Sequence, residues 1–445
     1  MFDVAVYGSG FAGFALATRL VERGKSVLVV ERGPRNDLRT SAELARIRFP
    51  WEPVESGGFD FGVEALEAFA NVPRFQGVGG TSMLWSGKWR TLDSVDFARR
   101  MGERGWPFDR ASLEPHDEAV ARRFGFSLEE EPEFEGLRHR VLSAGLRLVR
   151  IALPKSPVRL AGKWLALEET AALRLQTDAR EIEFAMKSGR ILSARCRGAE
   201  GHPWFEIEAN THVVAAGGIA STALVAHLVA QAGTGNRPFM GGYMDHPKGE
   251  VGQMRPRHHL DDLELLLQAD ESQRLYAVTL PEEEIIAEGM GNHTIFLWSQ
   301  RSGASGARRP SRSRRVQMVI NAEQFPEPWN GVSCPDGNTV RWRISGETRR
   351  DVDRFLSLIL PRLEAYFGPV TRARWIPLRG ASHPAGCTPY STSPAPGELH
   401  PDGRIEGIDN AFCASSSGFP FAGSANPTLT VAALADRLAS RLSSP

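Results

Sequence analysis

Apolar and glycine-rich positions follow one another at the start of the chain in an order that predicts a strand, a turn, a helix and a second strand. Residues 3–7 are mostly apolar, and the glycine-rich stretch 8–13 comes directly after them. Apolar side chains then recur at helical spacing as far as Gly24, and residues 27–30 form another apolar run that ends in Glu31. This order predicts a β–α–β unit with the glycine turn after its first strand.

Two later segments have the same character and predict further parts of one parallel sheet. Residues 211–218 have the pattern of a buried strand that ends in two glycines and opens into a helix over 221–232. Near the C-terminus, leucine and alanine recur at helical spacing over 427–442. Because the three pieces are far apart in sequence, they predict a parallel-sheet domain interrupted by long insertions.

The insertions have a different pattern. Residues 92–165 and 245–375 hold most of the tryptophans, and the stretches 316–320 and 340–344 alternate between apolar and polar side chains. The alternation predicts strands of a sheet with one polar face, and residues 349–367 have the spacing of an amphipathic helix. The insertions therefore predict a second, sheet-based unit.

A basic loop rich in serine and glycine interrupts the second insertion at residues 301–315. Its charge allows it to dock an anionic partner or a lipid surface, and a solvated loop without any partner explains the same composition. Both interpretations stay open at the level of sequence.

Composition and charge narrow the class of protein. The 445 residues are 42% hydrophobic and 24% charged, and 53 basic residues balance 53 acidic ones, so we expect no nucleic-acid partner. No run of about 18 apolar residues is present, which predicts no membrane span. The four cysteines are far apart, and the chain enters its first strand without a basic, apolar leader. We therefore predict a cytoplasmic protein without structural disulfides.

The turn at residues 8–13 has the spacing of a dinucleotide-binding loop. Gly8 permits the tight turn, Gly10 lets the backbone approach a pyrophosphate, and Gly13 lets helix and strand pack closely. The helix N-terminus offers free N–H groups to that anion, and Glu31 stands where a ribose hydroxyl pair is usually bound. The pattern predicts a dinucleotide but does not distinguish NAD from FAD.

Further segments along the whole chain resemble the glucose–methanol–choline (GMC) family of flavin oxidoreductases. They are, in order, VYGSGFAGFALATRLVERGKSVLVVERG, GGTSMLWSG, GWPFDRASLEP, VVAAGGIASTALV, GGYMDHP, AEQFPEP, HPAGCT and GFPFAGSANPTLTVAALADRLA. Each segment alone is modestly specific, but their common order and spacing make the resemblance strong.

The resemblance implies an α/β fold with a Rossmann-like FAD-binding domain built from discontinuous segments and a β-sheet-based α+β substrate (cap) domain. The corresponding boundaries are 1–91, 166–244 and 376–445 for the FAD-binding domain and 92–165 and 245–375 for the substrate-binding domain. It also implies that the protein oxidises the CH–OH group of a small-molecule alcohol, with a sugar or glycoside among the candidates, by hydride transfer to the flavin.

The resemblance also assigns site residues. His383 corresponds to the base that takes the hydroxyl proton, and Asn426 to its partner, which donates a hydrogen bond to the substrate oxygen. The residues that correspond to FAD contacts are Gly8, Gly10, Phe11, Ala12, Gly13, Glu31, Arg32, Gly79, Gly80, Thr81, Ser82, Ala179, Ala216, Gly217, Ser415, Asn426, Pro427 and Thr428. No metal site is expected.

The chain departs from the family in several places. The loop that carries a flavin-linking histidine in some relatives contains Met83 and Trp85 instead, so we expect non-covalent FAD. Ser415 and Ser416 stand where an acidic residue is common in the family, so one cofactor contact is expected to be weakened or rebuilt. The chain is also shorter than most members, and the turn at residues 245–247 is interpreted as structural, with no chemistry assigned.

Two other functions remain compatible with the sequence. Hydroxynitrile lyases also resemble this family, and a lyase would keep FAD without reducing it. A non-catalytic flavin protein that delivers electrons would use the basic loop for docking. Tryptophans such as Trp298 and Trp342 could stack on sugar rings or simply belong to the core. The sequence leaves the electron acceptor open among oxygen, a quinone and a protein.

Overall fold

The computed structural model describes most of the chain. The described residues are 1–35, 44–46, 73–83, 85–98, 105–129, 132–154, 156–168, 172–198, 203–267, 274–299, 315–334 and 339–443. The basic loop at residues 301–315, whose role the sequence leaves open, lies outside these residues except for Arg315. Within the described part of the chain, no helix combines the length and the apolar character needed to cross a bilayer.

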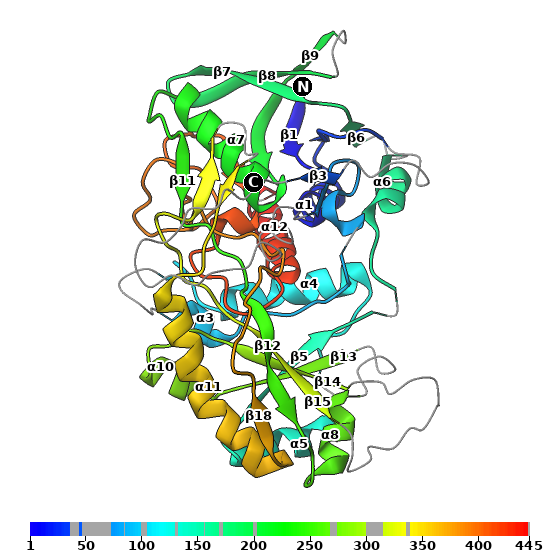
Figure 1. Ribbon diagram of the computed structural model, residues 1–445. Helices are drawn as coiled ribbons and strands as arrows, with labels where there is room; N and C mark the ends of the chain where they lie inside the picture. The colour runs from blue at the N-terminus through cyan, green and yellow to red at the C-terminus, as the bar shows by residue number, and fades with distance from the viewer. Residues whose placement is uncertain are drawn as a thin grey trace.

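A five-stranded parallel sheet is the centre of the upper half of the molecule (Figure 1). Its strands, in spatial order, are β19 (Ala411–Cys413), β10 (Ala209–Val214), β1 (Phe2–Tyr7), β2 (Val27–Val30) and β6 (Leu173–Gln176). All four pairings are parallel. Strands distant in sequence thus join one sheet, as the scattered apolar runs predict.

Alternating side chains of this sheet enter two separate cores. Val4 and Val6 face helices α1 (Phe11–Glu22) and α12 (Thr428–Leu442), whereas Ala5 and Tyr7 face α7 (Gly217–Gln231). The antiparallel strands β7 (Glu181–Lys187), β8 (Arg190–Arg197) and β9 (Trp204–Ile207) extend the second layer. Strands covered on both faces explain the near-continuous apolar runs in the sequence.

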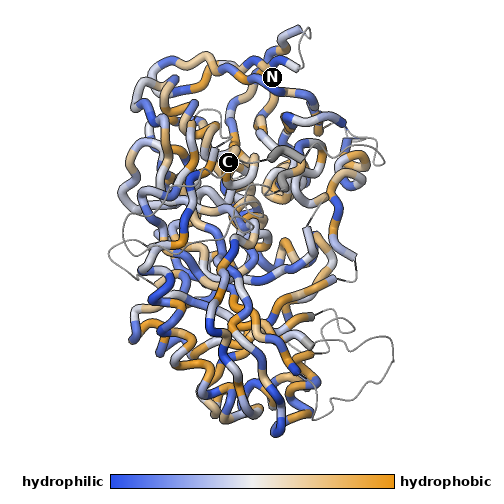
Figure 2. Tube along the Cα trace, in the orientation of Figure 1, coloured by the Kyte–Doolittle hydropathy of each residue, from blue (hydrophilic) through white to orange (hydrophobic). Residues whose placement is uncertain are grey.

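A second, six-stranded sheet occupies the lower half (Figure 1). Its order is β18 (Val370–Arg372), β12 (Lys248–Met254), β15 (Val316–Asn321), β14 (Thr294–Ser299), β13 (Arg274–Thr279) and β5 (Arg147–Ala152). Helices α5 (Pro132–Ser143), α8 (Leu260–Leu267) and α11 (Gly346–Phe367) cover one face and form a core with it. Figure 2 shows apolar stretches in both halves, in agreement with separate cores.

Shorter elements complete the fold. The strands are β3 (Leu44–Arg46), β4 (Pro73–Phe75), β11 (Phe239–Gly241), β16 (Gly331–Ser333) and β17 (Val340–Arg341). The α-helices are α3 (Ser94–Phe97), α4 (Glu114–Phe124), α6 (Leu160–Glu168) and α10 (Glu282–Ala287), and the 3₁₀ helices are η1 (Gly80–Met83), η2 (Ala111–Leu113) and η3 (Ser416–Gly418). Helices α4 and α6 pack in the core around α1, although they belong to the insertion 92–165. The division into two domains with the boundaries given above stays a prediction.

The α/β fold class and most predicted elements are confirmed, with one exception. The stretch 316–320 is strand β15, but only Val340 and Arg341 of the stretch 340–344 are a strand, and they pair in a small sheet with β16 and β11. The prediction of one common sheet is therefore wrong. The reason is local: the backbone N–H of Arg343 donates to the Asn330 side chain, and its C=O accepts from Gln324, so side chains replace the strand ladder.

Candidate active site

A tight turn holds His383 beside the segment that contains Asp245 and His246. One oxygen of the buried Asp245 carboxylate, Oδ1, accepts hydrogen bonds from three backbone N–H groups, those of His246 (2.7 Å), Ala381 (3.1 Å) and His383 (2.9 Å). Ser382 adopts a left-handed conformation (φ 61°), which a non-glycine residue rarely does. The carboxylate therefore holds the backbone that leads into the histidine.

The carbonyl side of the turn is fixed from the parallel-sheet half. The Ser416 hydroxyl donates to the C=O of Pro384 (2.6 Å), and its own C=O accepts from the N–H of Gly386 (2.9 Å). A Cβ on Gly218, at the start of α7, would lie 2.7 Å from the same Pro384 oxygen. Close packing of α7 on this turn thus needs a glycine at position 218.

The His383 ring lies between a second histidine and an asparagine. Its Nδ1 is 2.9 Å from Nδ1 of His246, and its Nε2 is 3.1 Å from Nδ2 of Asn426. Because an amide nitrogen only donates, Nε2 of His383 accepts and Nδ1 carries the proton that His246 accepts. The single lone pair of the ring is therefore on Nε2, where it accepts from Asn426.

Burial and neighbouring charge keep His383 neutral. Burial lowers its pKa well below the ordinary 6.5, and the neighbouring His246, Lys248 and Lys88 add repulsion. Burial also lowers the pKa of His246 to about 4 and raises that of Asp245 to about 6. The imidazole is therefore unprotonated near neutral pH, as a general base requires.

Buried polar groups hold the segment that carries Asn426. The guanidinium of Arg90, only 1% exposed, donates to the backbone C=O and hydroxyl of Ser424 (both 3.1 Å). Asn321 of β15 donates to the same C=O (2.7 Å), and the Glu323 carboxylate accepts from the N–H of Gly423 (3.1 Å). Arg90 and two groups at the end of β15 thus position one asparagine.

The glycine turn has the shape that a dinucleotide requires. A Cβ at Gly13 would lie 2.0 Å from the C=O of Gly8, and one at Gly8 2.5 Å from that of Ala215, so both positions admit only glycine. At Gly10, by contrast, a Cβ would meet no atom of the described protein within 4 Å, so the space beside it is open. Helix α1 begins there with no side-chain cap and no acidic residue in its first turn.

The loop at residues 79–82, which also begins with two glycines, lies against this turn. A Cβ on Gly80 would be 3.2 Å from the Cα of Gly10, so the two loops meet beside the uncapped end of α1. Free backbone N–H groups at a helix N-terminus bind phosphate well. The residues present therefore fit the pyrophosphate of FAD.

Glu31 is placed at the end of β2, but it already has protein partners. Its Oε2 accepts from the N–H (3.1 Å) and hydroxyl (2.6 Å) of Ser9, and its Oε1 accepts from the N–H of Gly33 (2.9 Å). Burial raises the pKa of this carboxyl, while these hydrogen bonds oppose the shift. Oε1 retains capacity for a further donor, so binding of a ribose hydroxyl there stays a prediction.

The other predicted cofactor residues take several positions. Phe11 packs on Trp85 and Trp89, Ala12 is buried, and Arg32 is exposed. Ser82 donates to the C=O of Gly79 (2.7 Å), whereas Thr81 is exposed.

The rest lie at the ends of the parallel strands and of the last helix. Ala179 donates its N–H to the C=O of Glu31 (3.0 Å), and the N–H of Ala216 donates to the Ser221 hydroxyl (3.0 Å). Gly217 has a left-handed φ of 78°, Ser415 is buried and caps η3, and Pro427 and Thr428 begin α12.

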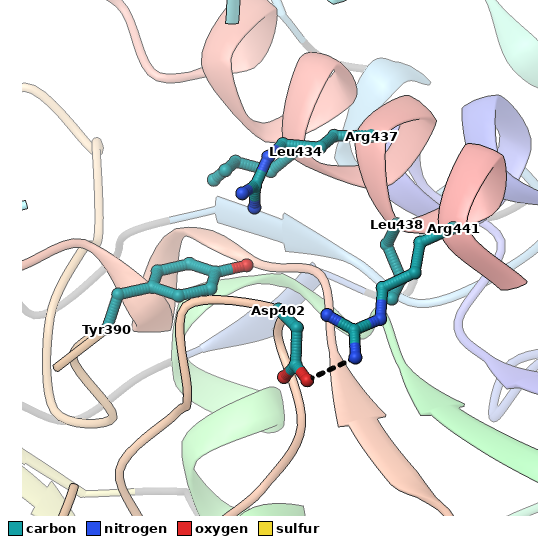
Figure 3. A pocket seen from close by; sticks show the side chains of 6 residues that line it. All are labelled: Tyr390, Asp402, Leu434, Arg437, Leu438 and Arg441. Carbon is teal, nitrogen blue, oxygen red and sulfur yellow. Dashed lines mark ion pairs between the residues drawn. The ribbon is translucent and has the colours of Figure 1, made fainter. Parts of the chain in front are cut away.

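Two cavities in the described structure contain neither His383 nor Asn426. One, of about 120 Å³, is lined by Tyr390, Asp402, Leu434, Arg437, Leu438 and Arg441 (Figure 3). There Arg441 forms an ion pair with Asp402 (2.7 Å) and Arg437 donates to a backbone C=O, so both cations are satisfied. The other, of about 500 Å³, lies beside Arg90, Asp93 and Arg147.

Sequence reasoning missed the histidine pair. It assigned no chemistry to His246, which the structure places against His383, and it did not single out Arg90, which holds the Asn426 segment. One signal was available, because both histidines directly precede a proline in segments that resemble the same family.

Comparison with protein families gives two matches. A family model described as "FAD binding domain" matches residues 3–245, and one described as "GMC oxidoreductase" matches residues 370–435, the stretch that contains both His383 and Asn426. A 139-residue stretch is 30% identical to a 2-methyl-1,2-propanediol dehydrogenase of Mycolicibacterium austroafricanum. That match covers 28% of this chain and 24% of the dehydrogenase, so it spans about a quarter of the relative's length.

Solved structures share the fold along the full chain. A pyridoxine 4-oxidase from Mesorbium loti has a TM-score of 0.63 and 18% identity, with 99% of each chain covered. A formate oxidase of Aspergillus oryzae has a TM-score of 0.60 and 14% identity, and a fungal aryl-alcohol oxidase 0.57 and 13%; each covers 99% of this chain and 98% of its own. These likenesses establish the fold.

Proposed function

The chain belongs to the GMC family of oxidoreductases, and from this premise we propose that it is an FAD-dependent enzyme that oxidises the CH–OH group of a small alcohol. The observation that carries the proposal is the contact between Nε2 of His383 and the Asn426 amide, 3.1 Å apart, in segments that buried polar groups hold in place. FAD, when bound, supplies the acceptor for the hydride that leaves the alcohol carbon.

The protein's own groups perform the proton chemistry. A substrate hydroxyl that displaces the Asn426 amide from Nε2 of His383 gives its proton to the lone pair of that nitrogen. Asn426 then donates its N–H to the oxygen as negative charge develops on it. His246 accepts from Nδ1 and holds the ring in this tautomer, so it is a positioning residue.

The cofactor contacts belong to the same proposal. The glycine turn and the uncapped start of α1 would hold the pyrophosphate, and the loop from Gly79 to Ser82 would lie beside it. We propose non-covalent attachment, because residues 79–87 contain no histidine or cysteine that could form a link. Acid precipitation should then leave a colourless pellet and a yellow supernatant, whereas a yellow pellet contradicts non-covalent binding.

An anaerobic experiment tests the reaction. Adding alcohols of several classes to the FAD-loaded protein should bleach the flavin absorption near 450 nm, and His383→Ala should retain FAD while bleaching slows by roughly 100-fold or more. Product formation without bleaching would instead indicate a lyase that keeps FAD unreduced. Equal bleaching rates in the His383→Ala variant would remove this histidine from the role of base.

A further inference from the structure

Two lysines approach the candidate active site from different segments. Lys88 precedes Trp89, whose backbone bridges to Ala152 at the β5 edge of the six-stranded sheet. Lys248 is the first residue of β12 and follows His246 by two positions. Both side chains are partly buried. The two cations thus come from opposite sides of the strands that lie between β5 and β12.

An aromatic surface lies between the lysines. The ammonium of Lys88 is 5.5 Å from the ring centroid of Phe296 and 5.5 Å from that of Trp298, and the ammonium of Lys248 is 6.0 Å from the Phe296 centroid. The two rings are nearly parallel, with an interplanar angle of 20°. They are on the face of β14 opposite the α11 core, because Ile295 and Leu297 occupy that core.

Neither ammonium forms an ion pair with a carboxylate in the part of the chain that the structure describes. Glu250, two residues beyond Lys248, accepts from the Gln317 amide (2.5 Å) instead. Burial lowers the pKa of both lysines, that of Lys88 to about 8, and repulsion by Lys248 adds to the effect on Lys88. Two partly desolvated cations without a counter-ion are costly, and an anion between them removes that cost.

The lysines also lie within electrostatic reach of the base. Repulsion from Lys248 and Lys88 contributes, after burial and His246, to the lowered pKa of His383. The backbone of the chain gives the same proximity, because Lys248 forms a β-bridge with Arg379, four residues before His383, and follows His246, which contacts His383, by two positions.

We propose that Lys88 and Lys248 form an anion-binding subsite, so that the substrate is an alcohol with a carboxylate or phosphate held above Phe296 while its hydroxyl meets His383. This inference rests on the proposed function for the identity of the reacting group. The anionic group itself is recognised by the lysines whether or not turnover follows, because two ammonium groups form charge-assisted hydrogen bonds with its oxygens.

Matched probes separate charge from shape. The probes are 4-(hydroxymethyl)benzoate, its methyl ester, and 4-(hydroxymethyl)phenyl phosphate, each titrated into FAD-loaded protein at pH 7 and followed by calorimetry and by bleaching. We expect the acid or the phosphate to bind at least tenfold more tightly than the ester, and the tighter of the two identifies the anion. Benzyl alcohol bleaching tests the proposed oxidation independently of charge.

Variants assign the effect to the lysines. Lys88→Met and Lys248→Met should each weaken binding of the preferred anion roughly tenfold, about one charge-assisted hydrogen bond, with ester binding unchanged. Arginine at either position should keep most of the affinity. Lys187→Met, on exposed β7, is the matched control and should change nothing.

Two outcomes overturn the proposal. One is equal affinity for acid, phosphate and ester in the unchanged protein. The other is a result in which the lysine variants bind FAD more weakly or shift the flavin spectrum, while their ratio of anion to ester affinity equals that of the unchanged protein. That result would assign the lysines to the cofactor. Anion binding without bleaching by any alcohol would instead retain the subsite and reject the proposed oxidation.

Discussion

Nδ1 of His246 lies 2.9 Å from Nδ1 of His383, so a single proton is shared between two imidazoles that burial keeps neutral. The side chain of Asn426 donates to Nε2 of His383, so Nδ1 of His383 is the donor and Nδ1 of His246 the acceptor in the hydrogen bond between the two rings. Asn426 thus sets the tautomer of the candidate base, and His246, from a distant segment of the chain, accepts the proton that this tautomer carries on Nδ1.

Replacing His246 by alanine should slow flavin reduction roughly tenfold, because Nδ1–H of His383 loses its acceptor and the ring its orientation. His246 also lowers the pKa of His383, so the acid limb of the rate profile should move to higher pH. Stopped-flow reduction between pH 5 and 8 measures both effects.

His246→Gln retains an acceptor and should recover much of the rate, and His258→Ala, at an exposed position, serves as the control. A purely structural role for His246 predicts a lower melting temperature with an unmoved acid limb. FAD content and melting temperature of each variant distinguish the two explanations.

The rate of flavin reduction should stay constant as the pH falls from 8 to 6.5. The pKa of His383 is lowered, so the neutral, proton-accepting form persists to a pH well below 6.5 and activity falls only when the ring gains a proton. Asp245, with a pKa raised to about 6, is also mostly charged above pH 6.5. An acid limb centred at or above pH 6.5 would contradict this assignment.

Asn426→Ala should lower the reduction rate between tenfold and roughly 100-fold, the usual effect of losing one donor to a developing oxyanion. Its N–H now stabilises neutral His383, so the acid limb should also move upward in the variant. Asn236→Ala, at an exposed site, is the control. An unchanged rate would leave Asn426 as a structural residue at the start of α12.

Two glycines of one turn should respond differently to alanine. Gly13→Ala places a Cβ 2.0 Å from the C=O of Gly8 and should destabilise the protein, with or without FAD, by about 2–3 kcal/mol. Gly10→Ala meets no protein atom within 4 Å, so the FAD-free protein should melt as before while FAD binds at least tenfold more weakly.

Gly162→Ala, also without a neighbour within 4 Å, is the control: it should leave FAD affinity unchanged and should not lower the melting temperature, because alanine favours the helix α6 that contains it. Melting curves of FAD-free protein and fluorescence titration with FAD measure the two effects. Unchanged FAD affinity in Gly10→Ala would mean that the cofactor does not approach this turn.

Much of the fold follows from local pattern. The apolar side chains of residues 3–7 and 27–30 are buried when these strands lie in a sheet covered on both faces. The helical spacing over 427–442 indicates a helix with one buried face. The stretch 340–344 shows the limit of such reasoning. Its alternation resembles a strand, but side-chain partners supplied by Gln324 and Asn330 take the hydrogen bonds that a longer strand would need.

The sequence by itself determined the parallel sheet and the glycine turn, because short-range spacing and backbone sterics fix these features. The two segments that carry His383 and Asn426 were identified by their resemblance to the GMC family. Only the tertiary structure placed His246 against the base and brought Lys88 and Lys248 to either side of Phe296. These groups lie far apart along the chain, and the distance between them depends on how the two sheets pack, which no local pattern encodes.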